Sequence, residues 1–362
     1  MSEHTLIERI DALRSATPTS PPAPPDITVW RAPTEADIDG IHAVAAAADA
    51  VDHPTWITPR EDIADTFDLP FIDHSRDSLV AVDADGRIVG FASAFLHPSR
   101  AGQLTVNLGG TVHPDHRRRG IGTVLLAWQR ARALEHLAAV VPTLAPAESL
   151  DPPVQAWTAD LKVYAEESNA DQQAIAARAG FRPERWFTTM ERDMTLPVPE
   201  LSAPEFEAPA GVSVVPFTHD RDDDARLARN DAFRDHWGSL PSQPETWQKF
   251  VGGPFFRPDL SRLAVDADGQ IVGFCLASVN EDDWAALGAS NSYIDLIGVV
   301  RAHRRRGIAP LVIAGTLRAI RDAGLERAVL DVDTASPTGA NTLYEGLGFH
   351  ATSQEVALVE RV

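Results

Sequence analysis

The chain has 362 residues, which is too long for one ordinary hydrophobic core and suits two domains of roughly 150 residues each. Its 52 acidic and 32 basic residues leave a formal net charge of -20, which disfavours nucleic acid as a partner. A single cysteine excludes a disulfide framework, and no apolar run is long enough to span a membrane. The acidic N-terminal segment differs from a secretory signal. We therefore expect a cytoplasmic protein without a membrane partner.

A short helical pattern and a proline-rich tether (residues 16–26) precede an internal repeat. The segment Ala81–Phe91 returns almost unchanged as Ala264–Phe274, 183 residues later. The sequence HRRRGI begins at His116 and again at His303, 187 residues later. Because the matches occur in the same order, we conclude that the chain is a duplicated domain.

Each copy predicts the same elements in the same order. A short strand and helical stretches come first, and a hairpin follows, with Gly86 and Gly269 in its two turns. A β-rich segment, an arginine-rich loop, an amphipathic helix, a strand, a helix that ends in Gly-Phe and a last strand complete the copy. This alternation predicts an α/β fold with a mixed sheet in each copy. The expected division is an N-terminal helix and tether at 1–26, a first domain at 27–196, a proline-rich linker at 197–210 and a second domain at 211–362.

The arginine-rich loop of each copy leads directly into a helix. Such a loop presents free backbone N–H groups, and the helix dipole adds about half a positive charge at the same place. Gly307 and Ala309 are small enough for a phosphate to approach the backbone, and Arg304 can donate bidentate hydrogen bonds. The third glycine and the following acid of a dinucleotide fingerprint are missing. The corresponding residues of the first copy are Arg117, Gly120 and Gly122.

The two loops resemble the R/Q-x-x-G-x-G/A signature of the GNAT superfamily of N-acyltransferases. The resemblance covers about residues 27 to 362 as two tandem units, each with the Gly-Phe ending of that family. In the family, the loop binds the pyrophosphate of coenzyme A, and pantetheine lies between two splayed central strands. The resemblance therefore implies acetyl-CoA as the cofactor. It assigns to coenzyme A the residues Ile297, Val299, Arg304, Arg305, Arg306, Gly307, Ile308, Ala309 and Ser336 of the second copy, and Arg117, Arg119, Gly120, Gly122 and Asn169 of the first.

Family members place a tyrosine in the helix before Gly-Phe and a carboxylate on the strand before the loop. Tyr344 stands five residues before Phe349, so the resemblance implies a general acid that protonates the sulfur of coenzyme A; a packing tyrosine is the alternative. Asp295, four residues before Val299, is either a general base or an acid that orders a strand end. Tyr293, on the same face two residues earlier, is a rival polar candidate.

The first copy lacks both chemical groups. Ala176 occupies the position of the tyrosine, and Leu108 aligns with Asp295. We therefore expect the first copy to be catalytically degenerate, a scaffold that can still bind coenzyme A, and the second copy to contain the working site.

In this family the loop between the first two helices covers the acceptor. A carboxylate, an imidazole and an indole in that loop would suit a cationic, partly apolar amine, although capping and packing explain each residue by itself. The residues that we assign to the acceptor are Asp235, His236 and Trp237, with Tyr293; the loop of the first copy holds Asp52, His53 and Trp56. We expect no metal site, because His113-x-x-His116 has no third ligand at useful spacing.

The resemblance implies an acetyl-CoA-dependent N-acetyltransferase, a monomer or homodimer, in which a primary amine of a small molecule attacks the thioester directly. The tandem arrangement is similar to that of actinobacterial double-GNAT proteins, mycothiol synthase among them, so acetyl transfer in thiol biosynthesis is a second hypothesis. An acyl-CoA-binding sensor without turnover is a third. Tyr344 argues against the sensor in the second copy, whereas Ala176 favours it in the first.

Overall fold

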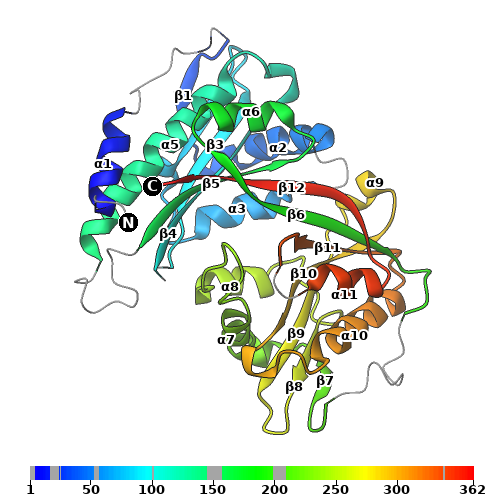
Figure 1. Cartoon of the computed structure of the whole chain (residues 1–362). Coiled ribbons are helices and arrows are strands. Elements are labelled where there is room, and N and C mark those ends of the chain that lie inside the picture. Colours follow the sequence, from blue (N-terminus) through cyan, green and yellow to red (C-terminus); the bar gives the residue numbers. More distant parts are fainter. Residues whose placement is uncertain are drawn as a thin grey trace. The chain divides into compact units, whose positions relative to one another are not determined.

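The computed structural model describes residues 5–16, 24, 26–52, 57–99, 102–144, 157–198, 209–336 and 339–362. The chain forms two compact units (Figure 1). Unit 1 comprises Met1–Arg185 and Glu355–Val362, and unit 2 comprises Trp186–Gln354. Most of the expected tether and linker lies outside the described residues. None of the helices in the described ranges has the length and hydropathy that a membrane crossing requires.

Unit 1 contains a mixed sheet with the strand order β1-β2-β3-β4-β5-β12, in which β4 and β5 are parallel and the other neighbours are antiparallel. Its strands are β1 (Val29–Arg31), β2 (Ser78–Val82), β3 (Ile88–Leu96), β4 (Gln103–Val112), β5 (Thr158–Glu166) and the C-terminal part of β12 (His350–Arg361). Its helices are α1 (Leu6–Ala16), α2 (Ile38–Asp52), α3 (Arg60–Asp68), α4 (His74–Asp77), α5 (Ile121–Val140) and α6 (Ala170–Arg178).

Side-chain alternation along β4 positions the core of unit 1. Leu104, Val106 and Leu108 are buried in one cluster with residues of α1, α5 and α6. Every second side chain of a strand points to the same face, so this face of the sheet lies against those three helices. On β2, Val80 packs with Ile41 of α2 in a separate cluster. Helices therefore cover both faces of the sheet.

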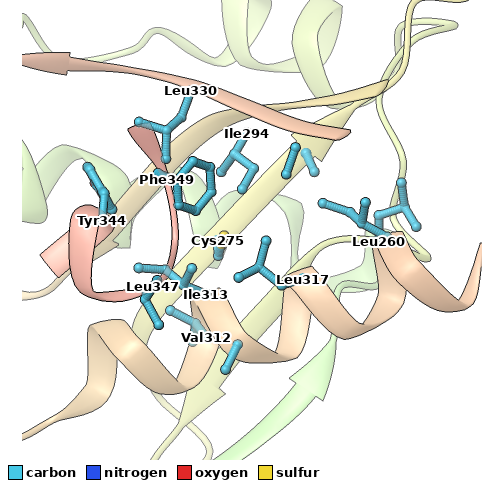
Figure 2. Close-up of a cluster of buried hydrophobic side chains, with 14 of the residues drawn as sticks. Leu260, Cys275, Ile294, Val312, Ile313, Leu317, Leu330, Tyr344, Leu347 and Phe349 are labelled. Carbon is cyan, nitrogen blue, oxygen red and sulfur yellow. The ribbon is translucent and has the colours of Figure 1, made fainter. Parts of the chain in front are cut away.

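Unit 2 repeats this arrangement with the strand order β6-β11-β10-β9-β8-β7, in which β10 and β11 are the parallel pair. Its strands are β6 (Arg182–Asp193), which enters the unit at Trp186, β7 (Ser213–Pro216), β8 (Arg262–Val265), β9 (Ile271–Ser278), β10 (Asn291–Val299) and β11 (Arg327–Asp333). Its helices are α7 (Asp222–Ala232), α8 (Pro244–Val251), α9 (Asp283–Leu287), α10 (Ile308–Asp322) and α11 (Ala340–Gly346). Part of the core beneath α10 and α11 is shown in Figure 2. The mixed α/β sheet expected for each copy is confirmed.

The last strand of each copy completes the sheet of the other unit. β6, which closes the first copy in sequence, pairs with β11 from Phe187↔Asp333 to Asp193↔Arg327. The end of β12 pairs with β5 from Glu355↔Glu166 to Arg361↔Asp160. The compact units therefore differ from the expected domains at 27–196 and 211–362 by one exchanged strand. Two copies of one fold offer equivalent sheet edges, so the local pattern of a strand does not specify which edge it joins.

We predict that Leu358→Ala loosens unit 1, although Leu358 belongs to the second copy in sequence. Leu358 is 1% exposed and packs in the core of unit 1, so the lost contacts should cost roughly 2–5 kcal/mol there. Hydrogen exchange should show reduced protection of the β5 amides and unchanged protection of β11. Leu330→Ala, at an equally buried site on β11, is the matched control and should give the reverse pattern. Lost protection in β11 alone after Leu358→Ala would contradict the strand exchange.

Candidate active sites

Each unit carries its arginine-rich loop between a central strand and the helix that follows. In unit 2, Arg305 and Gly307 have φ values of 60° and 79°, and in unit 1, Arg118 and Gly120 have values of 63° and 89°. Left-handed residues that alternate with other conformations turn successive N–H groups into one concavity, which binds anions. A Cβ added at Gly307 would meet no atom within 4 Å, so the space in front of α10 is open. The loop geometry fits the pyrophosphate of coenzyme A.

The first arginine of each loop forms an ion pair within its own unit. The Nη1 and Nη2 atoms of Arg304 lie 2.6 and 2.8 Å from the carboxylate oxygens of Asp235, and this pair holds the pKa of Asp235 at about 2. Arg117 and Asp52 form the same bidentate pair in unit 1, at 2.8 and 2.7 Å. Sequence reasoning assigned Arg304 and Arg117 to phosphate and Asp235 to the acceptor. In the structure, Arg304 joins its loop to Asp235, just after α7, and Arg117 joins its loop to Asp52 at the end of α2. The two ion pairs therefore anchor the loops.

The other loop arginines differ between the units. In unit 1, Arg118 pairs with Asp171 of α6, and Nη1 of Arg119 lies 2.8 Å from a carboxylate oxygen of Asp26. In unit 2, Arg305 and Arg306 are exposed and form no ion pair within the part of the chain that the structure describes. The loop of unit 2 thus keeps two cationic side chains that can approach a phosphate.

Asp295 is the extra residue of a β-bulge in β10. Ile294 pairs with Ala277 and Leu296 with Leu276, so no residue of β9 faces Asp295. The bulge also reverses the alternation of the strand: Ile294 and Ile297 both pack in the core beside α10, whereas Leu296 packs on the other face. Bulges re-aim side chains and are frequent next to active sites.

The corresponding strand of unit 1 has no bulge. β4 pairs with β3 without interruption, and Leu108 faces Ala94. Ala94 corresponds to Ala277 in the repeat, so Leu108 corresponds to Ile294. The expected alignment of Leu108 with Asp295 is wrong by one residue, because Asp295 has no counterpart in the first copy.

The bulge lies where the central strands part. β10 and β11 pair only at Asn291–Tyr293 with Arg327–Val329. Asp295 lies two residues beyond the last paired residue, and its Oδ2 atom accepts a hydrogen bond of 2.7 Å from Ser278 Oγ of β9. This bond fixes the carboxylate of Asp295 at the level where β10 and β11 part.

Tyr344 lies in the same region but is a buried residue of the core. It is 8% exposed, and its ring centroid lies 6.1 Å from that of Phe349 (Figure 2). Burial, with a smaller contribution from Cys275, raises the pKa of the Tyr344 hydroxyl above its ordinary value. Burial also raises the pKa of the Cys275 thiol to about 12, with a smaller contribution from Asp295.

Ala176 occupies the place of Tyr344 in unit 1. The N–H of Phe181 donates to the carbonyl of Ala176 at 3.1 Å, and the N–H of Phe349 donates to that of Tyr344 at 3.0 Å. The two helix ends are therefore equivalent. Ala176 and Tyr344 occupy the same structural position, so the first copy lacks the tyrosine at that position.

Tyr293 is linked to an acid that sequence reasoning missed. Its hydroxyl donates a hydrogen bond of 2.6 Å to Asp331 Oδ2 on β11. Asp331 has no motif around it, and only the parallel pairing of β10 with β11 brings it beside Tyr293. With Asp295, it gives the open end of this strand pair two carboxylates.

The remaining assigned residues are more dispersed. His236 Nδ1 lies 3.2 Å from the carbonyl of Trp237, whose ring packs 6.1 Å from that of Phe187 in unit 2. Asn169 caps α6 by accepting a hydrogen bond of 3.1 Å from the N–H of Gln172. The N–H of Ser336 donates to the carbonyl of Asp333 at 3.0 Å. Ile297, Val299 and Ile308 pack in the core of unit 2. His53 and Trp56 lie outside the described residues.

A cavity of about 590 Å³ extends through unit 1 from the loop into the space between β4 and β5, with α6 on its side. Of the first-copy residues that we assigned to coenzyme A, four line it, namely Arg117, Gly120, Gly122 and Asn169, and Arg119 is not among its lining residues. Leu108 and Ala176 are also in the lining. Unit 1 therefore retains the space for a long ligand that begins at the loop.

Comparison with known proteins gives a consistent result. The model of the acetyltransferase (GNAT) family matches residues 44–156 and 223–349. The mycothiol acetyltransferase of Kineococcus radiotolerans is 31% identical over 338 residues, which cover 92% of this chain and 97% of that protein. That of Salinispora tropica is 29% identical over 330 residues, 90% of this chain and 92% of the relative.

Solved structures show the same fold over most of the chain. A GCN5-related N-acetyltransferase from Sphaerobacter thermophilus is 27% identical, with a TM-score of 0.62, and the match covers 92% of this chain and 95% of that one. A tandem GNAT protein from the clavulanic acid biosynthesis pathway has a TM-score of 0.63 at 17% identity and covers 92% and 98%. The chain thus belongs to the GNAT family of acetyltransferases, as a tandem of two GNAT domains, and is an acetyl-CoA-dependent N-acetyltransferase with a small-molecule acceptor.

Proposed function

We propose that unit 2 transfers the acetyl group of acetyl-CoA to a primary amine of a small cationic molecule, and that unit 1 binds a coenzyme A thioester without turnover. The observation that carries this proposal is the bulge at Asp295. Unit 2 has a carboxylate at the level where its central strands part, whereas unit 1 has neither the bulge nor a tyrosine at the position of Tyr344.

Binding of the donor in unit 2 depends on the loop. Acetyl-CoA supplies the acyl group as a reactive thioester. The backbone N–H groups around Gly307, the N-terminus of α10 and the guanidinium groups of Arg305 and Arg306 hold its pyrophosphate. This fixes the donor so that its acyl end extends into the space between β10 and β11, and such positioning is worth roughly 7–11 kcal/mol at best.

Asp295 acts as the general base. An ammonium group must lose a proton before its nitrogen can attack, and a carboxylate oriented by Ser278 can accept that proton directly or through water. Asp331, bound to Tyr293, adds a second negative charge at the same opening. Two carboxylates favour a cationic acceptor over a neutral or anionic one.

Tyr344 assists the departing sulfur. Its raised pKa keeps the phenol protonated at neutral pH. A thiol of this type has a pKa of about 8.5, so full proton transfer from the phenol to the thiolate is uphill. We therefore propose that Tyr344 stabilises the sulfur mainly by donating a hydrogen bond, and its contribution to the rate is moderate.

The acceptor class follows from the relatives. Mycothiol acetyltransferases match most of this chain and most of their own length, and we propose that this chain acts on the same class of amine. An amine of another small molecule is the alternative. A coenzyme A release assay with a panel of amines, including the acceptor of those relatives, separates the two. Absence of release with every amine would favour the sensor hypothesis for the whole chain.

We predict that Gly307→Glu abolishes acetyl transfer, whereas Gly120→Glu leaves it intact. A carboxylate in the loop blocks and repels pyrophosphate, so each variant should lose one binding event in a calorimetric titration with acetyl-CoA. Both glycines have positive φ, so Gly307→Ala and Gly120→Ala are the controls for backbone strain alone. Normal acetyl-CoA binding and turnover by Gly307→Glu would show that the loop of unit 2 is not the donor site.

Asp295→Asn should lower kcat/KM by about 10²–10⁴-fold while acetyl-CoA affinity stays unchanged. A base works only when it is deprotonated, so the rate of the parent falls as the pH falls through its pKa, and the variant should lose this limb of the pH–rate profile. An unchanged profile would transfer the role to Tyr293 and Asp331, and Asp331→Asn would then remove the limb instead.

Tyr344→Phe should lower kcat by about 10²-fold and leave the fold and the acetyl-CoA affinity intact. The substitution removes only the hydroxyl, and the ring keeps its contacts in the core. Ala176→Tyr is the matched control, because it introduces the tyrosine into unit 1. When it is combined with Gly307→Glu, which inactivates unit 2, it should restore no activity, because unit 1 also lacks the bulge carboxylate. Full activity of Tyr344→Phe would exclude the hydroxyl from the reaction.

A further inference from the structure

The cavity of unit 1 is wide where the corresponding part of unit 2 is filled. The loop lines one part of the cavity, and Leu108, Leu126, Val163 and Ala176 line another. Leu108 and Val163 come directly after the last paired residues of β4 and β5, and Leu126 of α5 and Ala176 of α6 line the same cavity. The acyl group of a bound thioester would lie here. Their side chains are apolar, so this part of the cavity suits an apolar group.

Three positions that line the cavity differ in side-chain size between the copies. The strand register matches Gly109 and Gly110 of β4 with Leu296 and Ile297 of β10. The helix ends match Ala176 with Tyr344. At all three positions, unit 1 has the smaller residue, and two of the three have no side chain beyond hydrogen. Gly110 and Ala176 correspond to Ile297 and Tyr344, which share one core cluster in unit 2, whereas Gly109 corresponds to Leu296 on the other face of the sheet.

In unit 2 the same region is occupied by its own side chains. Tyr344 and Leu330 pack with Val312, Ile313 and Cys275 in one buried cluster (Figure 2). Protein interiors are close-packed, so a cluster of this kind leaves room for a small acyl group at its margin and not for a chain. Unit 2 is suited to acetyl for this reason.

Gln129, a polar residue in the lining of the unit 1 cavity, already has hydrogen-bond partners in the protein. Nε2 of Gln129 donates to the carbonyls of Ser93 and Gly109, at 2.9 and 2.6 Å. These bonds hold the side chain of Gln129 against the strands, and its amide N–H groups are not available to a polar ligand. An apolar chain meets no unpaired donor from this residue.

We propose that unit 1 binds a coenzyme A thioester whose acyl group is an apolar chain longer than acetyl. This inference rests on the proposed function, because it requires that the loop of unit 1 hold the coenzyme A part. Burial of the chain among apolar side chains supplies affinity that acetyl cannot supply. Unit 1 has no bulge carboxylate and has Ala176 at the position of Tyr344, so it keeps its ligand as the intact thioester.

Calorimetry on the full chain with Gly307→Glu tests this, because unit 2 then no longer binds the donor. Acetyl-, butyryl-, hexanoyl- and octanoyl-CoA are titrated in turn. Each CH₂ group that enters the cavity should tighten binding by up to about fourfold, and octanoyl-CoA should bind at least about tenfold more tightly than acetyl-CoA. Equal affinities across the series would overturn the proposal, and this readout needs no variant of unit 1.

Ala176→Leu fills the cavity and should weaken octanoyl-CoA binding by about tenfold while the affinity for coenzyme A stays within about threefold. Ala177→Leu, the same change at the exposed neighbouring residue, is the matched control and should alter neither. Equal weakening of both ligands by Ala176→Leu in a folded protein would contradict the assigned position of the chain. Gly120→Glu should remove all binding. If a thioester still binds to this variant, the assignment of the loop as the coenzyme A site is wrong. If binding requires the loop but does not change with the length of the acyl chain, only the inference about the acyl group is wrong.

Discussion

The parting of two parallel strands is the constraint on which both sites depend. β4 and β5 pair from Gln103↔Thr158 to Asn107↔Lys162, and β10 and β11 pair over three residues, after which each pair separates toward its C-terminal end. Backbone groups that face such a gap have no strand partner, so they are available to a ligand that runs between the strands. The loop and the helix N-terminus follow the same end of β4 and of β10. Each unit thus combines an anion-binding end with a slot, before any catalytic side chain is considered.

The duplication kept this frame and changed what occupies the slot. One inserted residue in unit 2 produces the bulge, reverses the alternation of β10 and places Asp295 at the opening. Tyr344 and larger strand residues then fill the interior beside it. In unit 1, the uninterrupted strand, its two glycines and Ala176 leave a cavity. In our proposals, the two copies therefore have different tasks: unit 2 provides a tight environment for proton transfer, and unit 1 provides space for a large ligand.

Charge is distributed in a way that reinforces this division. The first loop arginine of each unit holds the loop in place through an ion pair, so recognition of phosphate falls mainly to backbone N–H groups. In unit 1, the next two arginines are also paired with carboxylates. In unit 2, both remain exposed in a chain whose net charge is -20. Under the proposed function, donor binding in unit 2 can therefore use direct charge attraction, whereas the proposed binding in unit 1 depends more on backbone geometry and apolar burial.

The sequence by itself determined the duplication, the mixed α/β sheet, the two anion-binding loops and the loss of Tyr344's counterpart at Ala176, because each is a local pattern or a repeat of one. Tertiary structure decided which residues meet. The ion pair of Arg304 with Asp235 joins residues 69 positions apart, and the bond of Tyr293 to Asp331 joins residues 38 positions apart. The bulge at Asp295 can be recognised only from the pairing of β10 with β9. Aligning the sequences of the two copies could not show which residue of the strand is the inserted one. The exchange of β6 and β12 was decided by tertiary structure as well, since two similar sheets present similar edges and only packing against a particular core selects between them.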